Sequence, residues 1–310
     1  MQIETLSLWD DRDDVTLTTF VSKTPEIMPM PLVRPAVIVC PGGGYNTCPR
    51  HGDEGDPVAM AFAMDGYQAF VLEYSVAATA PLEKTLFPAQ VRDLGKAILT
   101  IREHAREWEV DVDKISIIGF SAGGHLCGMY ATAWYTPVLS EFFHEAPEVF
   151  KPLTAMLIYP VADYVVQEAF RKSHPSPLGN VDMNTHVFGT ADPDEELQKK
   201  YSPAYYVSEH TVPVFIAAAR DDGLVTAQNA LALAVKLQEQ GIPYELHMFE
   251  YGDHGFSLGR NLIQPYRQDK AHACAQWLPM AKTFLMHHIA PETTEYETGV
   301  FAKIEEMRRA

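Results

Sequence analysis

The sequence predicts an α/β protein built on a mostly parallel, twisted sheet with helices on both faces. Short, continuously apolar runs alternate with helical patterns along most of the chain. Continuous apolarity indicates strands that are covered on both faces, which is typical of parallel sheets. The run 115–119 leads directly into a glycine-flanked turn and then into a helical segment. This alternation implies βαβ units with right-handed crossovers.

Six apolar runs are predicted to form buried strands, at 36–40, 69–74, 115–119, 153–159, 214–218 and 244–249. Apolar residues at steps of three and four predict an amphipathic helix between the second and third of these strands, over 89–108. Helices are also expected over 224–240, where Gly241-Ile-Pro243 ends the pattern, and over 271–288.

Two stretches interrupt the alternation, an aromatic and acidic one at 135–152 and a polar one at about 161–212. The second contains Pro175, Pro177, Pro193 and Pro203. A long aperiodic stretch inside a compact fold is most often a functional insertion. We therefore interpret 1–310 as a single domain in which 161–212 forms a cap or lid, a partly disordered surface excursion being the alternative. The acidic start at 10–14 and the tail after Pro291 are expected to be peripheral.

Charge and composition narrow the function classes. Of the 310 residues, 24 are Lys or Arg and 41 are Asp or Glu, giving a formal charge of −17. Such a surface disfavours nucleic acid and anionic membranes, and it suits a small neutral or cationic substrate or simply aids solubility. The first residues lack the basic and apolar regions of a secretion signal, and no apolar run is long enough to span a bilayer. We expect a cytoplasmic protein, although a chain whose signal peptide had been removed would look the same; homo-oligomerisation stays open.

The four cysteines show no metal-ligand spacing, so no metal or cofactor is expected. Cys40 and Cys127 lie in apolar strand and helix contexts, which predicts buried free thiols. Cys48 lies in a polar loop and is expected to be exposed.

The turn Gly119-Phe-Ser121-Ala-Gly123 predicts a nucleophile elbow, a sharp strand-to-helix turn that exposes one serine hydroxyl. Glycines are needed there because strand and helix backbones approach too closely for side chains. Ser121 is the predicted nucleophile.

A serine nucleophile needs a base, and the base needs an acid that orients it. In this arrangement the acid and then the histidine follow late strands, in that chain order. His254 comes directly after the last predicted strand among small turn-forming residues, whereas His125, one turn into the helix after Ser121, is expected to be packed. Asp222 is the favoured acid; its neighbour Asp221 is interpreted as a turn residue or helix cap.

The glycine run Cys40-Pro-Gly-Gly-Gly-Tyr45 follows the first predicted strand, at a position where backbone N–H groups approach a substrate closely. Gly43 and Gly44, together with Ala122 after the nucleophile, are the predicted oxyanion-hole donors. A phosphate-binding loop is the alternative, but the run has neither a Gly-Lys-Ser/Thr ending nor G-x-G-x-x-G spacing.

The chain resembles the α/β-hydrolase esterases of the BD-FAE, or acetyl-xylan-esterase-like, type, which are related to the hormone-sensitive-lipase and carboxylesterase families. The resemblance covers about 35–285, and its motifs include Pro41-Gly-Gly-Gly-Tyr45, Gly66-Tyr-Gln-Ala-Phe70, Gly119-Phe-Ser-Ala-Gly-Gly-His-Leu126, Tyr159-Pro-Val161, Tyr201-Ser-Pro203, Asp221-Asp222 and Gly252 to Gly255. Two departures, Ala218-Ala-Arg220 where the family often has His-Thr and Thr226 where a proline is common, affect pocket shape.

The resemblance implies a cofactor-free serine esterase with Ser121, Asp222 and His254 as its triad. It implies short acyl, in particular acetyl, esters of carbohydrates such as xylo-oligosaccharides as substrates. The same triad also serves amidases and peptidases, including formamidase-like and prolyl-peptidase-like enzymes, which is the alternative. A non-catalytic binding protein is disfavoured because all three triad members are present.

Overall fold

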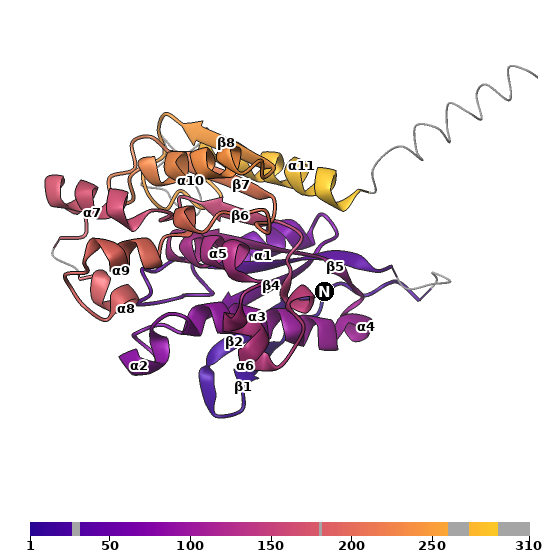
Figure 1. Cartoon of the computed structure of the whole chain (residues 1–310). Coiled ribbons are helices and arrows are strands. Elements are labelled where there is room, and N and C mark those ends of the chain that lie inside the picture. The colour runs from indigo at the N-terminus through magenta and orange to yellow at the C-terminus, as the bar shows by residue number, and fades with distance from the viewer. Residues whose placement is uncertain (27–31, 180–181, 260–272, 291–310) are drawn as a thin grey trace, which may run out of the picture.

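The computed structural model describes residues 1–26, 32–179, 182–259 and 273–290. Its centre is an eight-stranded sheet with the order β1-β2-β4-β3-β5-β6-β7-β8 (Figure 1). The strands are β1 (Thr5–Trp9), β2 (Arg12–Phe20), β3 (Arg34–Cys40), β4 (Gln68–Glu73), β5 (Val110–Phe120), β6 (Ala155–Ile158), β7 (Val214–Ala219) and β8 (Tyr244–Phe249). From β4 to β8 all neighbours are parallel. The six predicted strands are therefore confirmed.

The expectation that the acidic start at 10–14 is peripheral was wrong. This segment is not peripheral, because β1 and β2 form an antiparallel hairpin turning at Asp10-Asp11, and β2 pairs antiparallel with β4. This hairpin was missed because its residues alternate between polar and apolar, as in a half-exposed edge strand, rather than forming a continuous apolar run.

Helices cover both faces of the sheet, as predicted. One face is covered by α3 (Ala89–Glu103), α5 (Ala122–Ala133) and α10 (Gln228–Glu239), and the other by α1 (Asp56–Ala63) and α11 (Trp277–Ile289). Successive residues of β5 show how the pleat separates the two cores, since Ile117 packs in the first and Ile118 in the second.

Helix boundaries differ from the predicted ranges in detail. The predicted helix 89–108 is divided at His104 into α3 and α4 (Ala105–Trp108). α10 begins at Gln228 rather than at 224, because Asp222 holds the preceding turn. The aperiodic stretch 135–152 contains α6 (Pro137–Phe143) and the short helix Pro147–Phe150. A further turn of helix, α2 (Leu82–Thr85), precedes α3.

The stretch between β6 and β7, at 161–212, contains three short helices: α7 (Tyr164–Ser173), α8 (Asn184–Phe188) and α9 (Glu195–Lys200). A 3-10 turn, Pro203–Tyr205, follows them. Asp163 caps α7 by accepting from Val165 and Val166, and Asp194 caps α9 by accepting from Leu197. We call 161–212 the cap segment; that it acts as a cap over a single domain is our proposal.

The structure confirms two of the three predictions made for the cysteines and contradicts the third. Cys48 is buried, not exposed, with its thiol 3.6 Å from the Leu72 carbonyl oxygen, while Cys40 and Cys127 are buried free thiols as predicted. The tail after Pro291 lies outside the described residues. Within the described ranges no helix has both the length and the apolarity to cross a membrane.

Candidate active site

Ser121 occupies a strained turn between β5 and α5. Its backbone has φ 53° and ψ −115°, a conformation that side-chain-bearing residues rarely adopt. A Cβ on Gly119 would lie 2.0 Å from the Gly123 carbonyl oxygen, and one on Gly123 would lie 2.0 Å from that of Cys40. Both glycines are thus required because the strand and helix backbones touch here, which is the reason the sequence analysis gave for glycines at this turn.

The structure brings together Ser121, His254 and Asp222, the three residues that the sequence singled out. The Ser121 hydroxyl lies 2.8 Å from Nε2 of His254, and Nδ1 of His254 lies 2.7 Å from Oδ2 of Asp222. These distances allow proton transfer from the serine to an imidazole held by a carboxylate.

Asp222 is buried and its second oxygen is fully occupied. Oδ1 accepts hydrogen bonds from the backbone N–H groups of Leu224 (2.9 Å) and Val225 (2.8 Å). These bonds fix the carboxylate in one orientation, which leaves Oδ2 for the imidazole.

Asp221 plays a different part from its neighbour. Its Oδ1 accepts from the N–H groups of Gly252 and Asp253, both at 2.8 Å, and so ties the loop after β7 to the loop that carries His254. Asp221 thus holds a turn, as one of its two interpretations predicted, but this turn follows β8 rather than β7, after which Asp221 itself lies.

The glycine run after β3 lies beside the elbow. Gly44 and Ala122 line the same cavity as Ser121, and Gly43 precedes them with φ 137°. Within the described part of the chain, no acceptor is bonded to the N–H groups of Gly43, Gly44 or Ala122. The Ala122 N–H also lies at the N-terminus of α5, where the helix dipole favours negative charge. Gly44 and Ala122 thus border the cavity at Ser121, and that their N–H groups, together with that of Gly43, receive a developing oxyanion stays a prediction.

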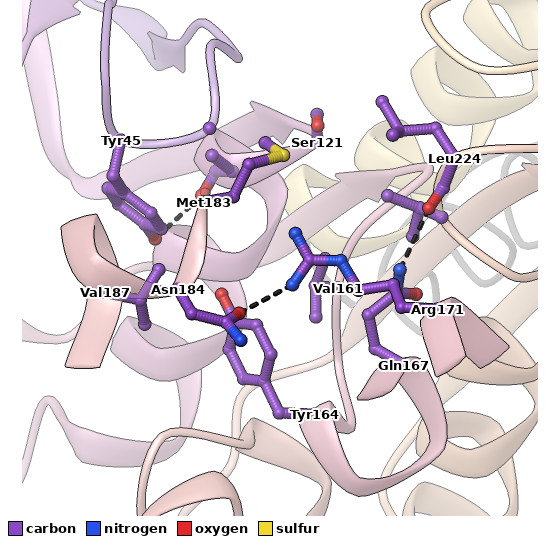
Figure 2. A pocket seen from close by; sticks show the side chains of 13 residues that line it. Tyr45, Ser121, Val161, Tyr164, Gln167, Arg171, Met183, Asn184, Val187 and Leu224 are labelled. Atoms are coloured by element: carbon purple, nitrogen blue, oxygen red, sulfur yellow. Dashed lines mark hydrogen bonds between the residues drawn. The ribbon is translucent and has the colours of Figure 1, made fainter. Parts of the chain in front are cut away.

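The cavity at Ser121 is small and mixed in polarity, with a volume of about 40 Å³. A space of this size admits groups only a few water molecules large. Figure 2 shows side chains of the cap segment along one wall of the cavity, with the Arg171 guanidinium bonded to Asn184. The wall is formed by Val161, Tyr164, Gln167, Arg171, Met183, Asn184 and Val187, with Leu224 and Val225 beside them.

His125 lies beneath the site as a packed residue, as expected. Nδ1 is 2.6 Å from the Tyr45 hydroxyl and Nε2 is 2.6 Å from the Tyr201 carbonyl oxygen. Burial lowers the pKa of His125 to about 4, against the smaller opposing effect of the Tyr201 carbonyl. A neutral imidazole that is bonded on both sides is unsuited to act as the base.

Two polar residues at the site were missed by sequence analysis. Glu54 bonds to Gly42 and Tyr159, and the Tyr159 ring contacts the His254 imidazole edge-on with centroids 5.0 Å apart. Nothing in the sequence distinguishes Glu54 from the neighbouring carboxylates Asp53 and Asp56. Tyr159 had a usable signal, because it is the last residue of the predicted strand 153–159 and so lies at the carboxyl edge of the sheet. Among the described residues no cluster of three or more His, Cys, Asp or Glu could hold a metal ion.

A mostly parallel sheet with a serine at the sharp turn after its fifth strand, and a histidine after its last described strand, defines the protein as an α/β-hydrolase. The chain belongs to the BD-FAE family, whose model matches residues 29–237.

Individual relatives agree with this assignment. The chain is 32% identical over 230 residues to endo-1,4-beta-xylanase B of Butyrivibrio fibrisolvens, covering 74% of this chain and 33% of that protein. It is 28% identical over 226 residues to an acetylxylan esterase of Xylanibacter ruminicola, covering 72% of this chain and 41% of that protein. The chain thus spans 33% and 41% of the lengths of these two curated relatives.

A solved structure matches over nearly its whole length. The acetyl ester-xyloside bifunctional hydrolase of Caldicellulosiruptor lactoaceticus superposes with a TM-score of 0.68 at 26% identity, covering 90% of this chain and 96% of that one.

Proposed function

We propose that the protein is a serine carboxylic ester hydrolase that removes short acyl groups, acetyl above all, from carbohydrates such as xylo-oligosaccharides. The observation that carries the proposal is the continuous line of hydrogen bonds from Ser121 through His254 to Asp222 beside a cavity of about 40 Å³. It is supported by relatives named as an acetylxylan esterase and an acetyl ester-xyloside hydrolase.

In the proposed reaction the Ser121 hydroxyl attacks the ester carbonyl while Nε2 of His254 takes its proton. Asp222 holds the imidazole in the required tautomer and stabilises the imidazolium. The N–H groups of Gly43, Gly44 and Ala122 receive the oxyanion. His254 then protonates the leaving alcohol, and water activated by His254 hydrolyses the acyl-enzyme, releasing the acid and restoring Ser121.

The cavity supports a small acyl group. Its volume is enough for a few water-sized groups, and Met183 and Val187 of the cap segment line it, so we expect a long acyl chain to meet these side chains. Arg171 donates through Nη1 to Glu168 and Asn184, and the rest of its guanidinium fork supplies donors that match sugar hydroxyls, whereas the amides of Gln167 and Asn184 are bonded within the protein. Glycosidase activity, as in the name of the xylanase relative, is not part of the proposal, because this chain matches only a third of that protein.

The experiment is a substrate panel. Initial rates are measured with p-nitrophenyl esters from acetate to octanoate, with acetylated xylo-oligosaccharides and with an aminoacyl anilide, and Ser121→Ala supplies the background. We expect the highest kcat/KM with acetate, a decline beyond butyrate and release of acetate from the oligosaccharides. A preference for octanoate or for the anilide would contradict the proposal, the anilide in favour of an amidase or peptidase.

A further inference from the structure

A carboxylate that the proposed reaction does not use lies directly below the glycine run. Glu54, two residues before α1, is partly buried, and each of its oxygens accepts a different hydrogen bond. Oε2 accepts from the backbone N–H of Gly42 at 2.7 Å, and Oε1 accepts from the Tyr159 hydroxyl at 2.6 Å. One side chain therefore connects the loop after β3 to the end of β6.

The bond to Gly42 acts close to the nucleophile. A Cβ on Gly42 would lie 2.6 Å from Oε2 of Glu54 and 3.0 Å from the Cβ of Ser121. The Gly42 backbone is thus enclosed between the carboxylate and the serine. Because Gly43 and Gly44 follow immediately, the bond that fixes Gly42 also sets where their N–H groups point.

The bond to Tyr159 acts on the general base. Tyr159 is buried, has φ 41°, and presents its ring to the His254 imidazole at an interplanar angle of 66°. Its hydroxyl accepts from the Ser257 N–H at 3.1 Å and donates to Glu54. Glu54 therefore orients the ring against which the imidazole rests.

Glu54 has the surroundings of an ionised carboxylate, because the Gly42 N–H can only donate and the hydroxyl proton of Tyr159 points at the other oxygen. Burial raises the pKa of Glu54, while Tyr159, the Gly42 N–H and the nearby His254 oppose that rise. If Glu54 were protonated or replaced by an amide, at least one of the two hydrogen bonds would be lost or reversed.

We propose that Glu54 is a positioning residue that holds the oxyanion-hole loop and the Tyr159–His254 contact in register with Ser121. The proposal rests on the proposed serine-hydrolase function, in that its effect is exerted on the oxyanion donors and the base. Glu54 itself touches no reacting atom.

The test compares Glu54→Gln with Glu73→Gln. Glu73 is a matched control, since it also accepts from a backbone N–H, that of Arg50 at 3.4 Å, and from a hydroxyl, that of Thr16 at 2.9 Å, but it contacts none of the proposed catalytic residues. Two readouts are used: kcat and KM for p-nitrophenyl acetate, and the second-order rate at which a fluorophosphonate labels Ser121. The second readout needs no ester substrate, so it separates failure of this proposal from failure of the proposed function.

We expect Glu54→Gln to lower kcat and the labelling rate by about tenfold or more, with KM changed by less than about threefold, because a misplaced oxyanion donor weakens the transition state rather than substrate binding. Glu73→Gln should stay within about twofold of wild type. Tyr159→Phe should reproduce part of the loss, and the double variant should lose less than the product of the single losses if both act through one contact.

The acidic limb of the labelling rate gives an independent readout. A negative charge near His254 favours its protonated form, so Glu54→Gln should move the midpoint of this limb to lower pH. The other acidic groups nearby are unchanged in the variant: Asp222 against the His254 imidazole, Asp253 at the His254 backbone N–H, and Asp53 beside Glu54.

Rates and a midpoint for Glu54→Gln equal to those of Glu73→Gln would overturn the proposal, as would an increase in KM alone. Should Glu54→Gln fail to fold by its thermal melt, Tyr159→Phe decides: labelling at the wild-type rate would overturn the proposal. If wild type is labelled at Ser121 but hydrolyses no ester, the proposed function fails and the comparison of labelling rates still stands.

Discussion

The two sides of the cavity are built by different means. The sheet side is formed by the loops after β3, β5, β7 and β8. It is held by hydrogen bonds that backbone N–H groups donate to side-chain carboxylates, as at Asp221, Asp222 and Glu54. The helices of the cap segment are also capped at backbone N–H groups, by Asp163 and Asp194, but at the cavity wall its side chains bond to one another, as Arg171 does to Glu168 and Asn184. Backbone anchors fix position, whereas long side chains have rotamer freedom to lose. We infer that the sheet side sets the chemistry and the cap segment sets which substrate fits.

His125 connects the two sides, because it bonds to Tyr45 of the sheet side and to the Tyr201 carbonyl oxygen of the cap segment. Its pKa is about 4 in the folded protein, below the ordinary value of 6.5, so the unfolded chain binds the extra proton first as the pH falls. The neutral His125 therefore contributes to the free energy of unfolding in full above pH 6.5. This contribution, about 3 kcal/mol, is lost as the pH falls to about 4.

This largest predicted effect is measured by urea unfolding at several pH values between 6.5 and 4. We expect the free energy of unfolding to fall more steeply for wild type than for His125→Gln, whose amide keeps one donor and one acceptor. His104→Gln, at a half-exposed histidine, should retain the wild-type slope. If the free energy of unfolding changed with pH equally in wild type and His125→Gln, the claim that a neutral His125 joins the two sides would be contradicted.

The cap segment should instead alter selectivity. The Cε of Met183 lies over the glycine run, 2.2 Å from where a Cβ on Gly44 would be. Removing this side chain enlarges the cavity, so Met183→Ala should raise kcat/KM for hexanoate relative to acetate by about tenfold, the scale of a few methylene contacts. The exposed Met286 of α11 provides the control, Met286→Ala. If Met183→Ala left the ratio of kcat/KM for hexanoate to that for acetate unchanged, the claim that the cap segment selects the substrate would be contradicted.

The same contrast explains what the sequence could predict. The parallel strands follow from continuous apolarity, and Ser121 from glycines whose absence of a side chain is a backbone necessity. The order of serine, acid and histidine along the chain, together with their places after strands, was enough to select Asp222 and His254 from many acids and twelve histidines. These signals are local or topological, so one sequence contains them.

Features that depend on a partner far along the chain were not predictable. The helices of the cap segment are five to ten residues long, too short for a clear period. Glu54 is distinguished from Asp53 and Asp56 only by its contacts with Gly42 and Tyr159, and Cys48 is buried because β4 lies against it. Such assignments require the tertiary structure.

The central claim, that Ser121 carries the acyl group during turnover, is tested most directly by trapping the intermediate. Wild-type protein is mixed with p-nitrophenyl acetate, quenched in acid within the first turnovers, digested and mapped by mass spectrometry. We predict one added acetyl group, on the peptide that contains Ser121, and none in Ser121→Ala treated identically. Acetate release at the wild-type rate by Ser121→Ala, or an acetyl group on another residue that forms and decays at the turnover rate, would contradict the claim.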